Sequence, residues 1–434
     1  MPASVNIPPI ALPFISDRAK STLGLATQFV DEECIPAHDP FEAQLGQGAS
    51  RWEKKPAILE QLKVKVKKLG LWNMFLGQHN GAGFSNVEYG LMAEYLGRSH
   101  IASEATNNPG PDTGNMELLV KYGTESQKRR WLDPLMKGKI RSAFLMTEPD
   151  IASSDARNIR CEIRRDGEEY VLNGSKLWSP GAGDPTCELY IFMGRIGGIS
   201  SVNQYTQHSV ILVPANAPGI TVHRMLSVFG YDDAPHGHGH ITLHNVRRLG
   251  PGRIHHSMRT IGAAETALEW MISHANDERK KTFGRSLSSH GTIREWIAKS
   301  RIEIDTARMT VLNAAIRIDQ EGAKAALREI AAAKVLVPRT ALRVIDRAIQ
   351  IWGAAGVCQD TPLPGLWDSA RTMRIVDGPD EVHLQQLGRR EIQRLGKGVQ
   401  EKLERQKREA DRLLSSYEGS LAAATLRGYN KANL

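Results

Sequence analysis

The sequence contains few cysteines and no long apolar run. Its four cysteines, Cys34, Cys161, Cys187 and Cys358, lie far apart. No pair has the spacing of a zinc site or a redox dithiol, so we expect a reducing compartment. No stretch approaches the ~18–20 apolar residues that span a bilayer, and we expect no membrane span. Residues 1–20 lack a basic segment ahead of their apolar residues, so we expect no secretory signal.

Internal repeats and low-complexity linkers are also absent, and 434 residues are too many for one compact core. Hydrophobic residues (41%) and charged residues (24%) occur in the proportions of a globular protein. Helical spacing gives way to strand alternation after residue 142 and returns from about residue 254. We therefore predict an α+β protein with four parts: an N-terminal helical domain (1–141), a middle antiparallel β domain (142–250), a C-terminal four-helix bundle (251–416) and a tail (417–434).

Individual elements follow from the same patterns. A turn at Asp166-Gly167 separates two expected strands, and residues 228–240 read as a loop. Pro338 should kink or interrupt the helix that contains it. The expected strands cover 161–165, 170–172, 189–194, 209–213 and 241–244. The expected helices of the bundle cover 258–282, 292–320, 324–350 and 382–414.

The net charge is +8, and part of the excess lies between Lys397 and Arg412. Charges of both signs alternate there, which is typical of a solvated helix face. No aromatic residues are interleaved with these charges, so nucleic-acid binding has little support. A positively charged opening for an acidic ligand, such as the phosphates of coenzyme A, explains the sign equally well.

The segment 144–155, Phe-Leu-Met-Thr-Glu-Pro-Asp-Ile-Ala-Ser-Ser-Asp, is an apolar strand that ends in hydroxyl-bearing and small residues. Small residues allow a backbone to approach a ligand, and hydroxyls with successive N–H groups can hold carbonyls or phosphates. A strand followed by a capped loop is the simpler interpretation. The segment alone does not decide between the two.

A resemblance favours the ligand site. Thr147-Glu148-Pro149, Ser154-Asp155 and the run Val-Leu-Asn-Gly-Ser-Lys-Leu-Trp at 171–178 resemble the flavin-binding centre of the acyl-CoA dehydrogenases. The residues of the first motif are most similar to those of the branch of family members ten and eleven. Later motifs agree with the family in order and spacing. The resemblance implies the acyl-CoA dehydrogenase fold and FAD. It also implies an acyl-CoA substrate, an electron-transfer flavoprotein or O2 as acceptor, and a homodimer or homotetramer.

The resemblance places several residues against the flavin. It implies contacts to the ring and the pyrophosphate from Phe144, Met146, Thr147, Ser153 and Ser154, with Ser154 also near the substrate. Trp178 would pack on the ring, although a Trp at a strand end is more often a core residue.

One position departs from the family. Relatives usually carry Ser or Thr two residues after this Trp, where the hydroxyl reaches the flavin N5. Here Pro180 has neither a hydroxyl nor an N–H. Ser179, which is adjacent, is the alternative hydroxyl, and the departure bears on the N5 contact and on the electron acceptor.

Two further motifs resemble contacts to the FAD of a neighbouring subunit. Residues 279–284 resemble the family's Arg-x-x-Phe-Gly run. Lys280 falls at the usual Arg position, with Arg279 beside it, and a lysine lacks the bidentate fork. A basic helix end is the alternative interpretation. Gln350 and Gly353 resemble the Gln-x-x-Gly that reaches the adenine half across the dimer, so a monomer should bind the cofactor poorly.

Residues 375–383, Ile-Val-Asp-Gly-Pro-Asp-Glu-Val-His, carry the candidate base. By default, a carboxylate before Gly-Pro caps a helix, and acids suit the first turn. In the dehydrogenases this place holds the carboxylate that removes the substrate α-proton. The resemblance therefore implies Asp377 as base, Gly378 as a substrate contact, and Pro379, Asp380 and Glu381 as cofactor contacts.

Some relatives carry the base at the start of the bundle instead. The corresponding run here, 253–259, contains no carboxylate, and Met258 holds the place of that base. This absence favours Asp377. The resemblance also brings Arg259 close to the substrate, whereas His255 and His256 are pocket or surface residues.

The function expected from this resemblance is FAD-dependent α,β-dehydrogenation of an acyl-CoA to a trans-2-enoyl-CoA, in fatty-acid catabolism or a specialised biosynthesis. A flavin oxidase of the acyl-CoA oxidase or nitroalkane oxidase type, which passes electrons to O2, is the alternative. A nucleic-acid-binding flavoprotein is a third interpretation that rests on the basic tail alone. Lys431-Ala432-Asn433-Leu434 looks like a noncanonical peroxisomal address. Without that address we expect a mitochondrial or cytoplasmic protein.

Overall fold

The computed structural model describes residues 7–77, 81–166, 169–197, 207–247 and 258–415. The chain divides into two compact units, Met1–Asp380 and Glu381–Leu434. Several predictions fall outside the described residues: Gly167 of the expected turn, His255, His256, and the tail at 417–434 with its address at 431–434. These stay predictions.

The N-terminal part of the first unit is helical, as predicted. Its α-helices are α1 (Asp17–Phe29), α2 (His38–Leu45), α3 (Ala57–Leu69), α4 (Asn86–Leu96), α5 (Ala102–Ala105), α6 (Asp112–Tyr122), α7 (Glu125–Gln127) and α8 (Asp133–Met136). Ser85 and Glu88 form a capping box at the start of α4. Glu88 also accepts hydrogen bonds from the N–H and the hydroxyl of Ser16, the cap of α1, so the two helix starts are joined.

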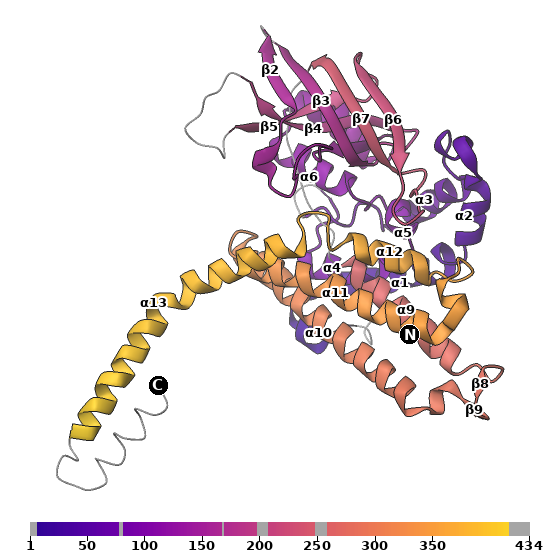
Figure 1. The fold of residues 1–434 in the computed structure, drawn as a ribbon. Coiled ribbons are helices and arrows are strands. Elements are labelled where there is room, and N and C mark those ends of the chain that lie inside the picture. The colour runs from indigo at the N-terminus through magenta and orange to yellow at the C-terminus, as the bar shows by residue number, and fades with distance from the viewer. Residues whose placement is uncertain (1–6, 78–80, 167–168, 198–206, 248–257, 416–434) are drawn as a thin grey trace. The chain divides into compact units, whose positions relative to one another are not determined.

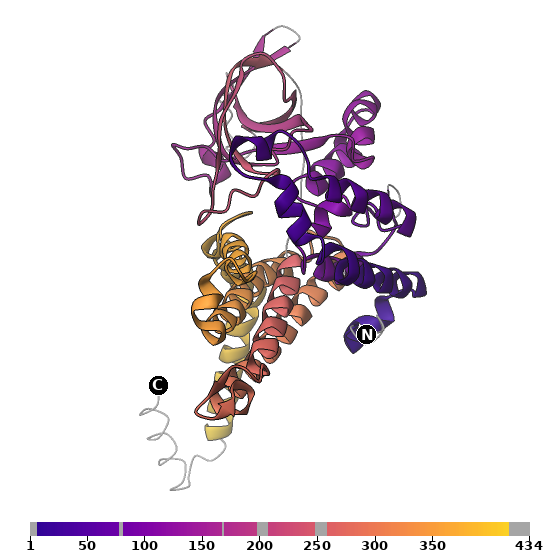
Figure 2. The same cartoon turned by 90° about the vertical axis from the view of Figure 1, so that its right-hand side faces the viewer.

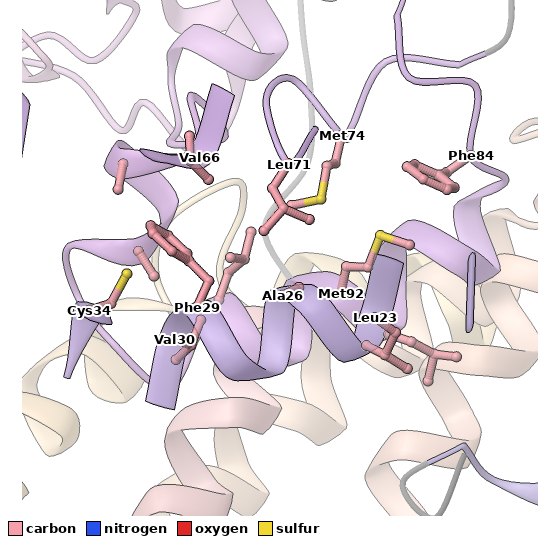
Figure 3. Close-up of a cluster of buried hydrophobic side chains, with 14 of the residues drawn as sticks. Leu23, Ala26, Phe29, Val30, Cys34, Val66, Leu71, Met74, Phe84 and Met92 are labelled. Atoms are coloured by element: carbon pink, nitrogen blue, oxygen red, sulfur yellow. The ribbon is translucent and has the colours of Figure 1, made fainter. Parts of the chain in front are cut away.

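A large apolar cluster holds these helices together (Figure 3). Leu23 and Phe29 of α1 pack there with Val66 of α3 and Met92 of α4. Leu71, in the apolar loop that follows α3, also belongs to the cluster and is fully buried. Burying a side chain of this size contributes about 1.5–3 kcal/mol to folding. The loop after α3 is therefore part of the core.

The middle part is one seven-stranded sheet (Figure 1), which is strongly curved in the turned view of Figure 2. Its strands are β1 (Arg141–Leu145), β2 (Glu162–Asp166), β3 (Glu169–Pro180), β4 (Cys187–Ile196), β5 (His208–Pro214), β6 (Ile220–Leu226) and β7 (His238–Arg247). The order is β1-β4-β2-β3-β7-β6, and β5 pairs with β4. Most pairings are antiparallel, as predicted. However, β4 lies parallel to β1 and β2, and β6 was not expected.

Among the described residues of the first unit, four complete α-helices follow the sheet: α9 (Arg259–Ala275), α10 (Gly291–Glu321), α11 (Leu327–Trp352) and α12 (Leu363–Thr372). Between α9 and α10, the expected helix to 282 is wrong, because β8 (Lys281–Thr282) and β9 (Arg285–Ser286) form a hairpin there. Pro338 lies inside α11, which continues without interruption. Arg308 of α10 bonds to Glu94 of α4 and Glu265 of α9, so it ties the bundle to the N-terminal helices.

The predicted helix over 382–414 corresponds to α13 (Asp380–Ser415), which makes up the described part of the second unit. Its side chains are exposed over residues 398–413. Ion pairs one turn apart, such as Glu391–Arg394, Glu404–Arg408 and Glu409–Arg412, lie along its surface. This agrees with the interpretation of the charged stretch as a solvated helix face.

Candidate functional site

A buried ion pair joins the end of β1 to β3. The Lys176 ammonium is fully buried and lies 2.8 Å from the Glu148 carboxylate and 2.8 Å from the Met146 carbonyl. The backbone N–H groups of Arg160 and Cys161 each donate to Glu148 at 2.9 Å. Every charge in the pair is therefore compensated, which is the condition under which a buried ion pair is stable.

Thr147 is fixed against β3 by the backbone. The Leu177 N–H donates to the Thr147 carbonyl at 2.9 Å, so Thr147 lies beside Trp178 although the two are far apart in sequence. Ser153 closes the turn that follows, because its hydroxyl accepts a hydrogen bond from the Glu148 N–H at 3.0 Å. Ser154 is exposed. The first two predicted flavin-binding motifs are thus brought together at one edge of the sheet.

Trp178 occupies a β-bulge. Lys176 pairs with Ile241 and Ser179 with Gly239, so β3 has one extra residue between these pairs. Trp178 has φ +53°, a left-handed conformation that is uncommon for a bulky residue, and 41% of its surface is exposed. Its ring contacts His238 edge-on, with centroids 6.3 Å apart. A bulge re-aims a side chain. Here it leaves an indole exposed beside Thr147.

The alternative hydroxyl, Ser179, points elsewhere. Because their partners on β7 are two residues apart, Ser179 and Lys176 share one side of the sheet, and both are fully buried. The Ser179 hydroxyl makes no hydrogen bond to the part of the chain that the structure describes. Its predicted contact with the flavin stays a prediction.

Phe144 contributes to the core as well as to the edge of the sheet. Its half-buried ring packs against a cluster that includes Met116, Leu119 and Ile191. The neighbouring residues Ala143 and Leu145 belong to a different cluster, as the alternation of a strand requires. Its predicted role at the flavin stays a prediction.

Asp377 lies at a strained turn between α12 and α13. Asp377 has φ +55° and Gly378 has φ +99°. Ile375, Val376 and Asp377 are all exposed. Strain of this kind persists only where surrounding contacts fix the backbone, and it is frequent at functional sites. The turn therefore presents a carboxylate and two apolar side chains at the surface of the chain.

The residues after Asp377 anchor the turn. Asp380 is 1% exposed, and its Oδ2 accepts from Nε of Arg339 and Nε of Arg374, both at 2.8 Å. Burial alone would raise the pKa of Asp380, but the two arginines outweigh it and lower the pKa. Pro379 is half-buried, and Glu381 opens the second unit. Asp380 thus holds the turn in place, and its predicted contact with the cofactor stays a prediction.

Arg259 begins α9 and binds the N-terminal helical part. Its Nη1 donates to the Asn108 carbonyl at 2.8 Å. Burial raises the pKa of the nearby Tyr89 to about 12, so this hydroxyl stays protonated. Tyr89 also lines a cavity of about 250 Å³ with Phe75, Phe84 and Glu117. Met258, at the other family position for a base, packs into the bundle core.

The second predicted cofactor set lies at the other end of the bundle. Arg279 is exposed and paired with Asp277, and Lys280 is exposed. Gln350 and Gly353 are exposed at the end of α11.

The contacts of Trp352, the last residue of α11, show that this end of the bundle lies at the end of α9. Its indole N–H donates to the Trp270 carbonyl, and its ring packs against His274, near the end of α9. At 1.5 Å per residue, His274 is roughly 20 Å from Arg259 along α9. The two sets are therefore separated within one chain, and delivery of the second to a partner's FAD stays a prediction.

Sequence reasoning did not assign a role to three residues of this site: Glu148, Lys176 and Lys334. Glu148 and Lys176 were visible only as letters of the Thr-Glu-Pro and Asn-Gly-x-Lys motifs. A fully buried lysine and a carboxylate bonded by two N–H groups need the tertiary structure to be recognised. Lys334 of α11 donates to the carbonyls of Met373 and Gly378, on either side of Asp377, and no local sequence pattern indicates this role.

The described residues contain neither a metal-binding cluster nor a membrane-spanning helix. No group of three or more His, Cys, Asp or Glu side chains in them is arranged to hold a metal ion. No helix within them combines the length and the apolarity needed to traverse a bilayer.

Three family models match consecutive parts of the chain. They are the acyl-CoA dehydrogenase N-terminal domain (residues 20–139), middle domain (143–246) and C-terminal domain (244–392). The chain belongs to the acyl-CoA dehydrogenase family. The resemblance seen in the motifs and the α+β fold expected from it are thereby confirmed.

Individual relatives agree. The chain is 50% identical over 388 residues to probable acyl-CoA dehydrogenase FadE2 of Mycobacterium tuberculosis (strain ATCC 25618 / H37Rv), covering 85% of this chain and 94% of that protein. It is 47% identical to acyl-CoA dehydrogenase family member 11 of Gallus gallus, over 87% of this chain. It spans only about half (51%) of that longer protein.

Solved structures show the same fold. A candidate acyl-CoA dehydrogenase from Mycobacterium abscessus matches with a TM-score of 0.82 and 42% identity, over 87% of this chain and 99% of that one. A glutaryl-CoA dehydrogenase of Mycobacterium smegmatis in complex with FADH2 matches with a TM-score of 0.69 over 86% of this chain and 94% of that one. At 22% identity, the second match supports the fold alone.

Proposed function

We propose that this chain is an FAD-dependent acyl-CoA dehydrogenase that converts an acyl-CoA to a trans-2-enoyl-CoA. The observation that carries the proposal is the Thr147–Trp178 edge. There the Leu177 N–H bonds to the Thr147 carbonyl, just before the hydroxyl-rich turn, and a bulge at the next residue leaves the Trp178 indole partly exposed. Family membership adds FAD as the cofactor. The solved relative that contains FADH2 shows that this fold accommodates a reduced flavin.

The residues present fit a flavin. Thr147 and Ser154 supply hydroxyl donors, and Trp178 supplies a flat apolar face of the kind that packs on an aromatic ring. When bound, FAD supplies a two-electron acceptor for the hydride that leaves the substrate β-carbon. The hydrogen bond from the Glu148 N–H to the Ser153 hydroxyl closes the turn that carries Ser154.

Asp377 acts on the substrate in this proposal. The α-proton of a thioester is weakly acidic, and a positioned carboxylate accepts it as the β-hydride departs. Asp is one methylene shorter than the family's usual Glu, so the turn must approach the substrate more closely. The exposed position of Asp377, with Gly378 directly after it, allows such an approach.

The test uses the assembled protein. Purified protein, reconstituted with FAD if needed, is mixed anaerobically with a panel from butyryl-CoA to palmitoyl-CoA, and flavin bleaching is recorded. We expect bleaching by at least one member, with formation of the matching enoyl-CoA. A protein that cannot be loaded with FAD, or whose flavin no acyl-CoA reduces, contradicts the proposal.

One observation, the proline at position 180, supports the alternative that the protein is an oxidase. Pro180 removes the hydroxyl that relatives place near N5, and the buried Ser179 does not favour its replacement. Hydrogen peroxide release during turnover in air, in the absence of an electron-transfer flavoprotein, would assign the oxidase reaction. Nucleic-acid binding rests only on the charge of the stretch between Lys397 and Arg412.

The Glu148–Lys176 pair predicts acid sensitivity. Burial alone would raise the pKa of Glu148, but Lys176 and the N–H groups of Arg160 and Cys161 outweigh it and lower the pKa. The folded pKa lies below the unfolded value of about 4.3, so the pair stabilises fully above that pH and loses this contribution as the pH falls through the folded pKa.

We therefore expect the protein to release FAD, measured in an ultrafiltrate, as the pH falls below about 4. Glu148→Gln should hold FAD more weakly at neutral pH and lose less of the remainder on acidification. Equal acid losses in the wild type and the variant would contradict this assignment.

A further inference from the structure

A buried lysine of α11 holds the turn that carries Asp377. Lys334 is 6% exposed, and its ammonium donates to the Met373 carbonyl at 2.6 Å and to the Gly378 carbonyl at 3.3 Å. Met373 precedes Asp377 and Gly378 follows it directly. A single side chain from another helix therefore bonds to the backbone on both sides of Asp377.

Three cations bond to this turn. Arg339 and Arg374 both donate to the Asp380 carboxylate. The third cation, Lys334, bonds to backbone carbonyls on both sides of Asp377. Burial lowers the pKa of Lys334, and the charges of Asp377 and Asp380 oppose this shift. The bond to the Gly378 carbonyl places the Lys334 ammonium beside the residue that follows Asp377.

A purely structural role does not explain the charge. The two acceptors of Lys334 are neutral carbonyls, and an uncharged donor such as an amide could satisfy both of them. Burying an ammonium costs more free energy than burying an amide unless an anion compensates it. Asp377 and Asp380 supply that compensation, and Asp380 is already bonded to two arginines.

We propose that Lys334 is a positioning residue for Asp377. Its ammonium fixes the Met373–Gly378 segment from both sides, and it is a buried cation beside the backbone of Asp377, the residue that accepts the proton. The inference rests on the proposed function, in which Asp377 removes the α-proton of the acyl-CoA.

The test separates the charge from the hydrogen bonds. Lys334→Gln keeps donors and removes the charge, Lys334→Met removes both, and Lys334→Arg keeps the charge. For each variant, FAD content is measured, and then the rate constant of flavin reduction as a function of pH. The substrate is the acyl-CoA of the panel that bleaches the wild type fastest. Lys324→Met, at an exposed lysine just before α11, is the matched control.

We expect the pH of half-maximal flavin reduction to rise by about one unit in the two neutral variants, because a nearby cation favours the ionised carboxylate. It should stay near the wild-type value in Lys334→Arg and Lys324→Met. An unshifted profile in a folded neutral variant would overturn the inference. So would a shift in Lys334→Arg equal to that in Lys334→Gln. Failure of both neutral variants to fold, with Lys334→Arg folded, would assign a structural role alone and overturn it too.

Asp377→Asn, measured in parallel, distinguishes this inference from the proposed function. If Asp377→Asn is still reduced at the wild-type rate, the assignment of the base fails, whatever Lys334 shows. If Asp377→Asn is inactive and the profile of Lys334→Gln is unshifted, the inference about Lys334 fails alone.

Discussion

Asp377→Asn is expected to give a folded, yellow protein whose flavin is no longer bleached by acyl-CoA at a useful rate. Asparagine keeps the size of the side chain and removes the base. General base catalysis contributes about 10²–10⁴-fold, so we expect the rate constant of flavin reduction to fall roughly 10³-fold. Stopped-flow absorbance of the flavin under anaerobic conditions measures this rate constant directly.

The matched control is Asp360→Asn, at an exposed aspartate between α11 and α12. It should leave the rate constant unchanged, because the residue has no part in the proposed chemistry. FAD content and thermal unfolding of both variants should match the wild type. Undiminished bleaching in Asp377→Asn would show that another group removes the α-proton.

Lys176→Met is expected to have the largest effect on the fold of the cofactor site. It leaves the Glu148 carboxylate buried without its cation, and breaking a buried pair in this way costs about 3–5 kcal/mol. We therefore expect a lower midpoint of thermal unfolding and loss of most bound FAD. Both are measured on the purified protein, by calorimetry and by flavin absorbance.

A second substitution tests the cause. Glu148→Gln in the Lys176→Met background removes the uncompensated charge. Its one amide oxygen replaces one of the two carboxylate oxygens, so the bond from the N–H of either Arg160 or Cys161 is kept. The double variant should therefore recover part of the lost stability. Lys299→Met, which breaks an exposed pair with Glu295, should change stability by at most about 1 kcal/mol. If the two lysine variants are equally stable, the buried pair has no special role.

The arrangement of helices and strands was largely readable from the sequence, because it depends on local periodicity. The helices α10 and α11 and the strands β2, β4 and β5 appeared close to their predicted bounds. The parallel pairing of β4 with β1 was not predicted, because no local pattern indicates which distant strand pairs with a given strand. The short α12 and the β8–β9 hairpin also lack a strong period.

The site was predictable to the extent that its residues belong to contiguous motifs. Thr147 and Trp178 were assigned from their motifs, and the structure places them side by side. The bulge that turns Trp178 outward depends on a one-residue excess over β7, which only the strand pairing reveals. The role of Lys334 could not be predicted from the sequence. It depends on hydrogen bonds to two carbonyls of a segment that lies about forty residues further along the chain.

The most direct measurement is an experimental structure of the assembled protein with FAD and a nonreactive acyl-CoA analogue. The account predicts the flavin ring against Trp178 and Thr147, and the Asp377 carboxylate about 3–3.5 Å from the thioester α-carbon, the separation of reacting atoms in a near-attack geometry. An α-carbon flanked by a different base, or a flavin bound away from the Thr147–Trp178 edge, would contradict it.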